Sequence, residues 1–152
     1  MAHQDSAMPP EDHEPGSDAA GEAGTAFACT SCGAVAGVVR LVPAGAAVDM
    51  GSPIGEQRFD RDGAMIDRWI GGRNWQALDP DRRARAGEIL AQPHPDPGAL
   101  HAIHWELAPF WCRGCRRPYC RDHWMSTVIM DDGFYDYTAG ICPSGHHQIL
   151  DD

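Results

Sequence analysis

Four short pairs of cysteine and histidine residues constrain this chain more than any other feature. The pairs are Cys29/Cys32, Cys112/Cys115, Cys120/His123 and Cys142/His146. The gap between the first two pairs is 79 residues, whereas the later gaps are only 4 and 18 residues. Two such side chains separated by two or three residues can face one point across a tight turn. We therefore expect each pair to supply half of a metal site.

Thiolate sulfur and imidazole nitrogen are the ligands that zinc prefers, and a structural zinc site is a tetrahedron closed by four protein groups. Four pairs make two Cys3His sites, so the sequence predicts two zinc ions. Six cysteines could instead form three disulfides in a secreted chain. The N-terminus has no basic start and no apolar stretch, so it does not resemble an export signal. We therefore favour metal binding in a reducing cytoplasm.

The segment CRGCRRPYCRDH, residues 112–123, resembles the central part of cross-brace zinc domains. It is similar to the FYVE-type pattern C-R-x-C-x4-C-x2-C, with His123 in place of the last cysteine. RING-type and other treble-clef domains share the same interleaved order, in which the first and third pairs hold one ion. The resemblance implies one site at Cys29/Cys32 with Cys120/His123, and a second at Cys112/Cys115 with Cys142/His146.

Two alternatives remain open from the spacing. In sequential pairing, the four residues between Cys115 and Cys120 suffice to close one site within 112–123, which leaves the first and last pairs to share the other ion. The final ligand is also ambiguous, because His147 directly follows His146. FYVE domains bind phosphoinositides through a basic stretch with paired histidines at the position that precedes Cys112 here. In this chain that position reads ELAPFW, so the resemblance does not imply lipid binding.

The chain divides into an N-terminal tail and one domain. Residues 1–26 hold six acidic residues and no lysine or arginine, a composition that predicts an acidic disordered tail. Residues 27–152 then form a small zinc-stabilised α+β domain with treble-clef-like cross-brace knuckles. The insert between the first two pairs, residues 34–108, should contain several short strands and one main helix.

Local patterns predict elements within this domain. Apolar β-branched residues favour a strand in 34–45, and weaker patterns favour strands at 54–59 and 63–70. Asp79 as the N-cap and Pro80 at the first helical position predict a helix over 78–92. Alternation of Ile103, Trp105 and Leu107 predicts a half-buried strand over 101–112, and a last strand is expected at 133–141.

Charge and composition limit the function. The formal net charge is −10 and all 12 basic residues are arginine, a bias typical of high-GC bacterial genes. An acidic chain disfavours nucleic acid and anionic membranes as partners. Four arginines within 113–121 could bind an acidic ligand, or could offset the charge of the thiolates.

We expect a non-catalytic binding or adaptor module whose partner is an unknown protein or an acidic ligand. The alternatives are a zinc-dependent metalloenzyme, in which one site keeps an open position, and a redox sensor that releases zinc on oxidation.

Overall fold

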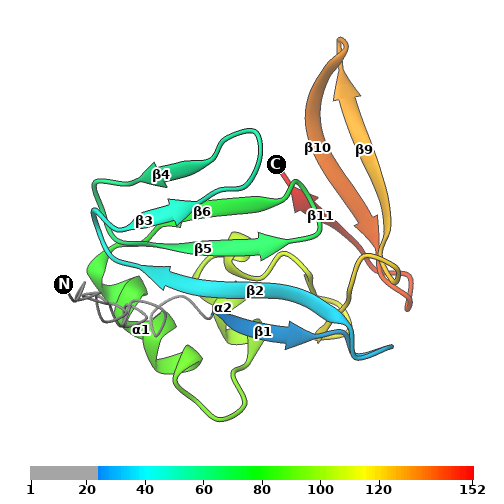
Figure 1. The fold of residues 1–152 in the computed structure, drawn as a ribbon. Helices are drawn as coiled ribbons and strands as arrows, with labels where there is room; N and C mark the ends of the chain where they lie inside the picture. The colour runs from blue at the N-terminus through cyan, green and yellow to red at the C-terminus, as the bar shows by residue number, and fades with distance from the viewer. Residues whose placement is uncertain (1–23) are drawn as a thin grey trace, which may run out of the picture.

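A computed structural model describes residues 24–152, and its largest element is a four-stranded antiparallel sheet (Figure 1). The strand order is β1-β2-β5-β6. The strands span Thr25–Ala28 (β1), Val35–Val42 (β2), Gly63–Arg68 (β5) and Arg73–Ala77 (β6). The turn between β1 and β2 contains the first knuckle, so this sheet fixes the position of Cys29 and Cys32.

Two helices and a 3-10 turn cover one face of this sheet (Figure 1). They are α1 (Pro80–Leu90), α2 (Pro97–Ile103) and η2 (Trp105–Leu107). The apolar core between these layers includes Val39, Ile66, Leu100 and Phe110. The short hairpin of β3 (Ala47–Asp49) and β4 (Glu56–Arg58) packs on the other face, where Val48 meets Val42 and Met65.

A second, three-stranded sheet follows in the order β11-β10-β9. Its strands span Met125–Asp131 (β9), Phe134–Ile141 (β10) and His147–Asp151 (β11). The hairpin of β9 and β10 projects from the body of the domain (Figure 1). Two short strands, Trp111–Cys112 (β7) and Arg117–Pro118 (β8), pair across the second knuckle.

The expected α+β class is confirmed, and so are several elements. The predicted helix begins at Pro80 with the Asp79 side chain accepting a hydrogen bond from the Arg82 amide. The strands expected in 34–45, 54–59, 63–70 and 133–141 correspond to β2, β4, β5 and β10. Sequence patterns did not predict β1, β3, β6, β8, β9 and β11, or the second helix, α2.

The predicted strand over 101–112 is wrong, because this segment holds the end of α2, the 3-10 turn and only two strand residues. Asp96 caps α2 by accepting a hydrogen bond from the Gly98 amide, and Pro97 begins the helix. This start signal overrides the period-two alternation. Ile103 and Leu107 are buried in the structure, and the predicted strand would have buried them too. Their apolar character therefore could not distinguish a helix from a strand.

The predicted tail meets the fold at its last residues. Thr25 and Ala26, placed at the end of the tail by composition, belong to β1. Residues 1–23 lie outside the described part of the chain. Within residues 24–152, none of the helices is long and apolar enough to cross a membrane.

Candidate metal centres

The eight predicted ligands gather into two groups of four. The first cluster contains Cys29, Cys32, Cys120 and His123, and the second contains Cys112, Cys115, Cys142 and His146. Within each group the ligand atoms all lie within 4.8 Å of one another. The grouping interleaves the four pairs along the chain, as the resemblance to cross-brace domains implied, and differs from sequential pairing.

The first cluster joins the β1–β2 turn to the segment before β9. The Nδ1 atom of His123 lies 3.6 Å from the sulfur of Cys29 and 3.3 Å from that of Cys120. The sulfurs of Cys32 and Cys120 are 3.6 Å apart. Backbone hydrogen bonds from Cys29 to Ala34 and from Thr30 to the Pro118 carbonyl hold this turn beside β8.

The second cluster joins the β7–β8 turn to the turn between β10 and β11. The sulfurs of Cys115 and Cys142 are 3.9 Å apart, and Nδ1 of His146 lies 3.3 Å from the Cys142 sulfur. The His146 amide also donates to that sulfur at 3.4 Å. His147, the alternative ligand, lies outside the cluster and pairs with Ile141 in the sheet.

These separations fit a tetrahedral zinc site. Zn–S bonds of about 2.3 Å and Zn–N bonds of about 2.0 Å imply ligand separations of about 3.8 Å between sulfurs and about 3.6 Å from sulfur to nitrogen. The observed separations run from 3.3 to 3.9 Å in both clusters. Each cluster supplies three sulfurs and one nitrogen, so both clusters can hold a metal ion such as zinc.

Each cluster also combines thiols of contrasting acidity. Burial raises the pKa of Cys29, but hydrogen bonds from backbone amides, Cys120 first among them, bring it down to about 7. Burial also raises the pKa of Cys142, but hydrogen bonds from the backbone amides of His146 and Ser144 lower it to about 7. At Cys112 burial dominates and raises the pKa to about 11. A bound divalent cation would stabilise the thiolate form of all of these groups.

Two side chains that the sequence did not identify as part of the sites support the second cluster. The Tyr119 hydroxyl lies 3.2 Å from the Cys115 sulfur, and burial together with the neighbouring Cys115 raises its pKa to about 12. It therefore keeps its proton and can donate to a thiolate. Buried Gln148 accepts from the Arg113 amide at 3.1 Å and donates to the Trp111 carbonyl at 2.9 Å, which fixes the knuckle to β11.

Tyr119 could have been inferred from the sequence, because it directly precedes Cys120 and follows Cys115 by four residues. Its ring is buried, as are the rings of Trp124 and Phe110, so the residue also contributes to the core. Gln148 gave no sequence signal, because its three partners come together only through the fold.

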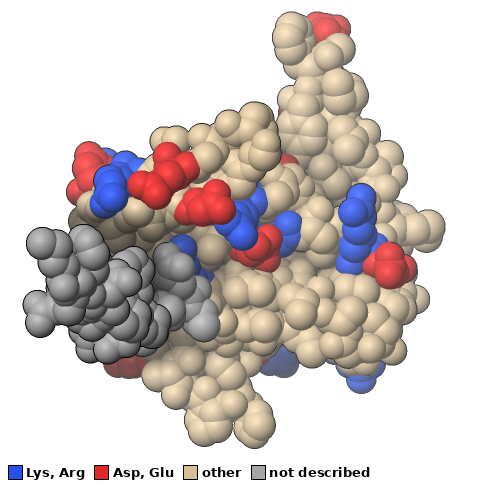
Figure 2. Space-filling model, viewed as in Figure 1, with Lys and Arg blue, Asp and Glu red and all other residues tan. Residues whose placement is uncertain are grey.

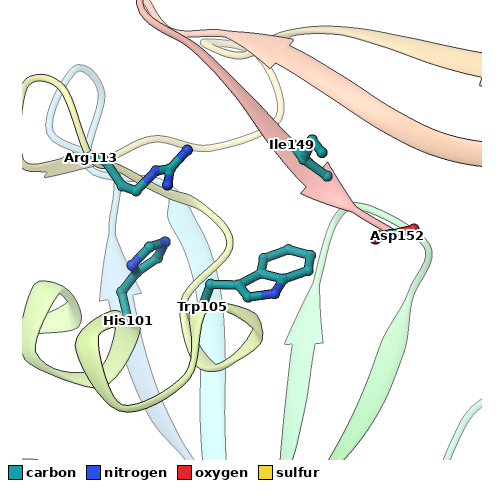
Figure 3. A pocket seen from close by; sticks show the side chains of 5 residues that line it. All are labelled: His101, Trp105, Arg113, Ile149 and Asp152. Carbon is teal, nitrogen blue, oxygen red and sulfur yellow. The ribbon is translucent and has the colours of Figure 1, made fainter.

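A pocket of about 240 Å³ borders the second cluster (Figure 3). Arg113, which lies between two ligands of the knuckle, points into it beside His101 of α2 and Trp105 of η2. Ile149 and Asp152 line the opposite side. Burial, then the charge of Arg113, lowers the pKa of His101 to about 4, so this imidazole is neutral at neutral pH. Within residues 24–152, the Arg113 guanidinium has no carboxylate partner.

Fold and site together define a small α+β domain built around two interleaved Cys3His clusters. The chain belongs to the family described as "Domain of unknown function (DUF8328)", whose model matches residues 19–152. Neither the curated proteins nor the solved structures contain a significant match to it.

Proposed function

We propose that this domain is a non-catalytic binding or adaptor module in which each Cys3His cluster holds one structural zinc ion. The observation that carries the proposal is the ligand count. Each cluster brings four protein donor atoms within 4.8 Å of one another, which is the full complement of a closed tetrahedral site. A catalytic zinc instead keeps one position for water or substrate.

The positions of the ligands support a structural role. The first ion would connect the sheet that contains β1 to the segment leading into β9, across a sequence separation of 88 positions from Cys32 to Cys120. The second would fasten the β7–β8 knuckle to the β10–β11 turn. Closing a loop of that length costs about 4 kcal/mol plus a constant, whereas zinc contributes about 10 to 16 kcal/mol in small peptide sites. We place the module in the cytoplasm, where thiols stay reduced.

The pocket beside the second cluster is our candidate for the binding surface. Its chemistry suits an acidic group attached to an apolar body, because a guanidinium and a neutral imidazole stand next to an indole and an isoleucine, while the Asp152 carboxylate lines the opposite side. Arginine binds carboxylates through two parallel hydrogen bonds. The zinc knuckle would thus present Arg113 to an acidic ligand.

The metal part of this proposal is tested by elemental analysis and X-ray absorption on the purified chain. We expect two zinc ions per chain, each with three sulfurs and one nitrogen. Cys29→Ser should release one ion and leave the second, because Cys112, Cys115 and Cys142 belong to the other cluster. A single ion, or a site with bound water among its ligands, would reject the structural assignment and favour the metalloenzyme alternative.

The binding part is tested by titrating the ¹⁵N-labelled protein with phenylacetate, a simple acid with an apolar body. Shifts should concentrate at Trp105 and Arg113 and should disappear in Arg113→Gln. Arg85→Gln is the matched control, because Arg85 is an exposed arginine of α1 away from the pocket. Equal shifts in both variants would show that the pocket does not select the carboxylate.

A further inference from the structure

The sheet of β9, β10 and β11 exposes far more apolar surface than the rest of the domain. The large apolar side chains that it exposes are Met125 (70%), Val128 (56%), Met130 (55%), Phe134 (77%), Tyr135 (46%) and Ile149 (45%). Elsewhere in residues 24–152, only Val35 and Ile54 are comparably exposed. Exposed apolar side chains gathered on one projecting sheet mark a surface that meets another molecule.

The outer half of the β9–β10 hairpin is a two-stranded ribbon. β11 pairs only with Thr138–Ile141 of β10, whereas residues 134–137 of β10 pair with β9 alone within the described chain. Apolar side chains lie on both faces of this ribbon, because Val128 and Met130 alternate with Ile129 along the strand. A two-stranded ribbon is marginally stable in water without a third strand or a covering layer.

The free edge of β9 lacks the features that normally prevent strands from pairing between molecules. From Met125 to Met130 the strand has no charge, no proline and no glycine. The irregularity in the hairpin lies in β10, between Tyr135 and Tyr137, which leaves β9 as the regular edge strand. Charges, prolines and bulges are the common means of blocking such an edge.

Charge is distributed unequally along the hairpin and indicates how a second strand would lie. The tip carries Asp131, Asp132 and Asp136 and no basic residue, whereas residues 112–123 at the base carry four arginines and one aspartate. Figure 2 shows acidic atoms at the tip, an uncharged stem, and basic atoms near its base. In an antiparallel pair of hairpins each acidic tip lies beside an arginine-rich base, whereas a parallel pair brings the tips together.

We propose that β9 is a dimerisation edge and that its occupant is β9 of a second copy of this chain, paired antiparallel about Val128. A two-fold axis there converts each three-stranded sheet into half of a continuous six-stranded sheet. Such an interface is isologous, which is the commonest symmetry of soluble dimers. The pairing supplies the third strand that the ribbon lacks and brings the Val128 side chains of the two copies side by side at the axis, which covers part of their apolar surface. This inference is independent of the function assigned to the pocket.

Light scattering coupled to gel filtration, followed by sedimentation over a concentration series, tests the proposal on the full chain. We expect a particle of twice the 16.5 kDa mass of one chain. Val128→Lys should raise the dissociation constant of the dimer by at least about tenfold, because the two introduced ammonium groups meet at the axis. Ile54→Lys is the matched control, since Ile54 has 58% exposure, close to the 56% of Val128, and lies outside this sheet.

Two further measurements separate edge pairing from other contacts. Amides of β9 should exchange more slowly at high protein concentration, and Val128→Lys should abolish that protection while both zinc ions stay bound. Added salt should weaken the dimer, because charge attraction aligns tip with base. A monomeric wild type at about 200 µM would overturn the proposal and assign the edge to a different protein. A dimer that Val128→Lys leaves intact would overturn it as well.

Discussion

Different interactions stabilise the two ends of this domain. The four-stranded sheet and its helices enclose a core of ordinary apolar side chains, among them Ile66, Leu100 and Phe110. At the other end, half of the eight buried residues are cysteines, packed with Tyr119 and Trp124. Thiols bury little apolar surface compared with leucine or phenylalanine. The first region can rest on hydrophobic burial, whereas the second would depend on the bonds that its thiols make to the metal ions we propose.

Hydrogen bonds and an ion pair connect the two regions within residues 24–152, and Ile70 of the β5–β6 turn packs among the cysteines. The buried Arg68 of β5 forms an ion pair with Asp151 at the end of β11. The Trp124 indole donates to the Phe110 carbonyl at 3.2 Å, and within the C-terminal sheet the Tyr135 hydroxyl donates to the same Asp151 carboxylate at 2.6 Å. If the two regions differ in stability as we argue, perturbations should separate them.

Metal removal should give the largest effect. We expect a strong chelator, or Cys112→Ser, to melt the C-terminal sheet, because the second cluster would lose its centre. The loss of about 10 kcal/mol or more of metal binding would match or exceed the whole stability of a typical domain. Hydrogen exchange followed by mass spectrometry should show β9, β10 and β11 losing protection before β2 and β5.

The order of these losses is the critical observation. If β2 and β5 exchange at the same rate as β10 after chelation, the domain is one cooperative unit and the contrast between its two regions fails. Ser126→Ala provides a control, because Ser126 is an exposed residue of β9 outside both clusters. It should leave both zinc content and the order of exchange unchanged.

The next largest effect should come from breaking the ion pair between Arg68 and Asp151. Asp151→Ala leaves the Arg68 guanidinium buried without its carboxylate, at a cost of about 3 to 5 kcal/mol in the free energy of unfolding. The side chain of Arg68 is only 5% exposed, so water cannot replace the lost partner. Chemical denaturation should measure the loss, and Asp152→Ala, at the exposed neighbouring residue, should cost almost nothing. A small effect of Asp151→Ala would show that the regions are not joined here.

A smaller, purely local effect is expected at Gly114. A Cβ atom at this position would lie 2.3 Å from the His146 ring, so Gly114→Ala must displace a ligand of the second cluster. Disturbing the support of a ligand typically lowers metal affinity about 10 to 100-fold. Competition with a chromogenic chelator should show one weakened site and one unchanged site.

Gly87→Ala is the matched control, since its nearest neighbour, Leu41, would be 3.5 Å from the new Cβ in ordinary contact. Alanine within α1 should raise helix stability slightly and leave both metal affinities alone. Two weakened sites in Gly114→Ala would contradict the separation of the clusters.

The sequence predicted the metal end better than the apolar end. Ligand identity and spacing are local, so all eight residues could be selected before the fold was known, and the resemblance to cross-brace domains implied their grouping. The segment around Ile103 and Leu107 was misassigned because apolar residues there face the core in a helix or a strand. β9 was not predicted because its apolar residues do not alternate with polar ones. Gln148 contacts residues 35 to 39 positions away, which no local pattern encodes.

The smallest predicted effect tests the apolar region alone. Asp79 caps α1 by accepting a hydrogen bond from the Arg82 amide at 2.8 Å. Asp79→Ala leaves that amide without its partner and should lower the free energy of unfolding by about 1 kcal/mol. Asp79→Asn keeps the cap and should lose much less, which separates the hydrogen bond from the charge. Zinc content should be equal in both variants, because α1 contributes no ligand. If Asp79→Ala instead releases zinc from either cluster, the helical layer supports the metal end directly and the two regions are not independently stabilised.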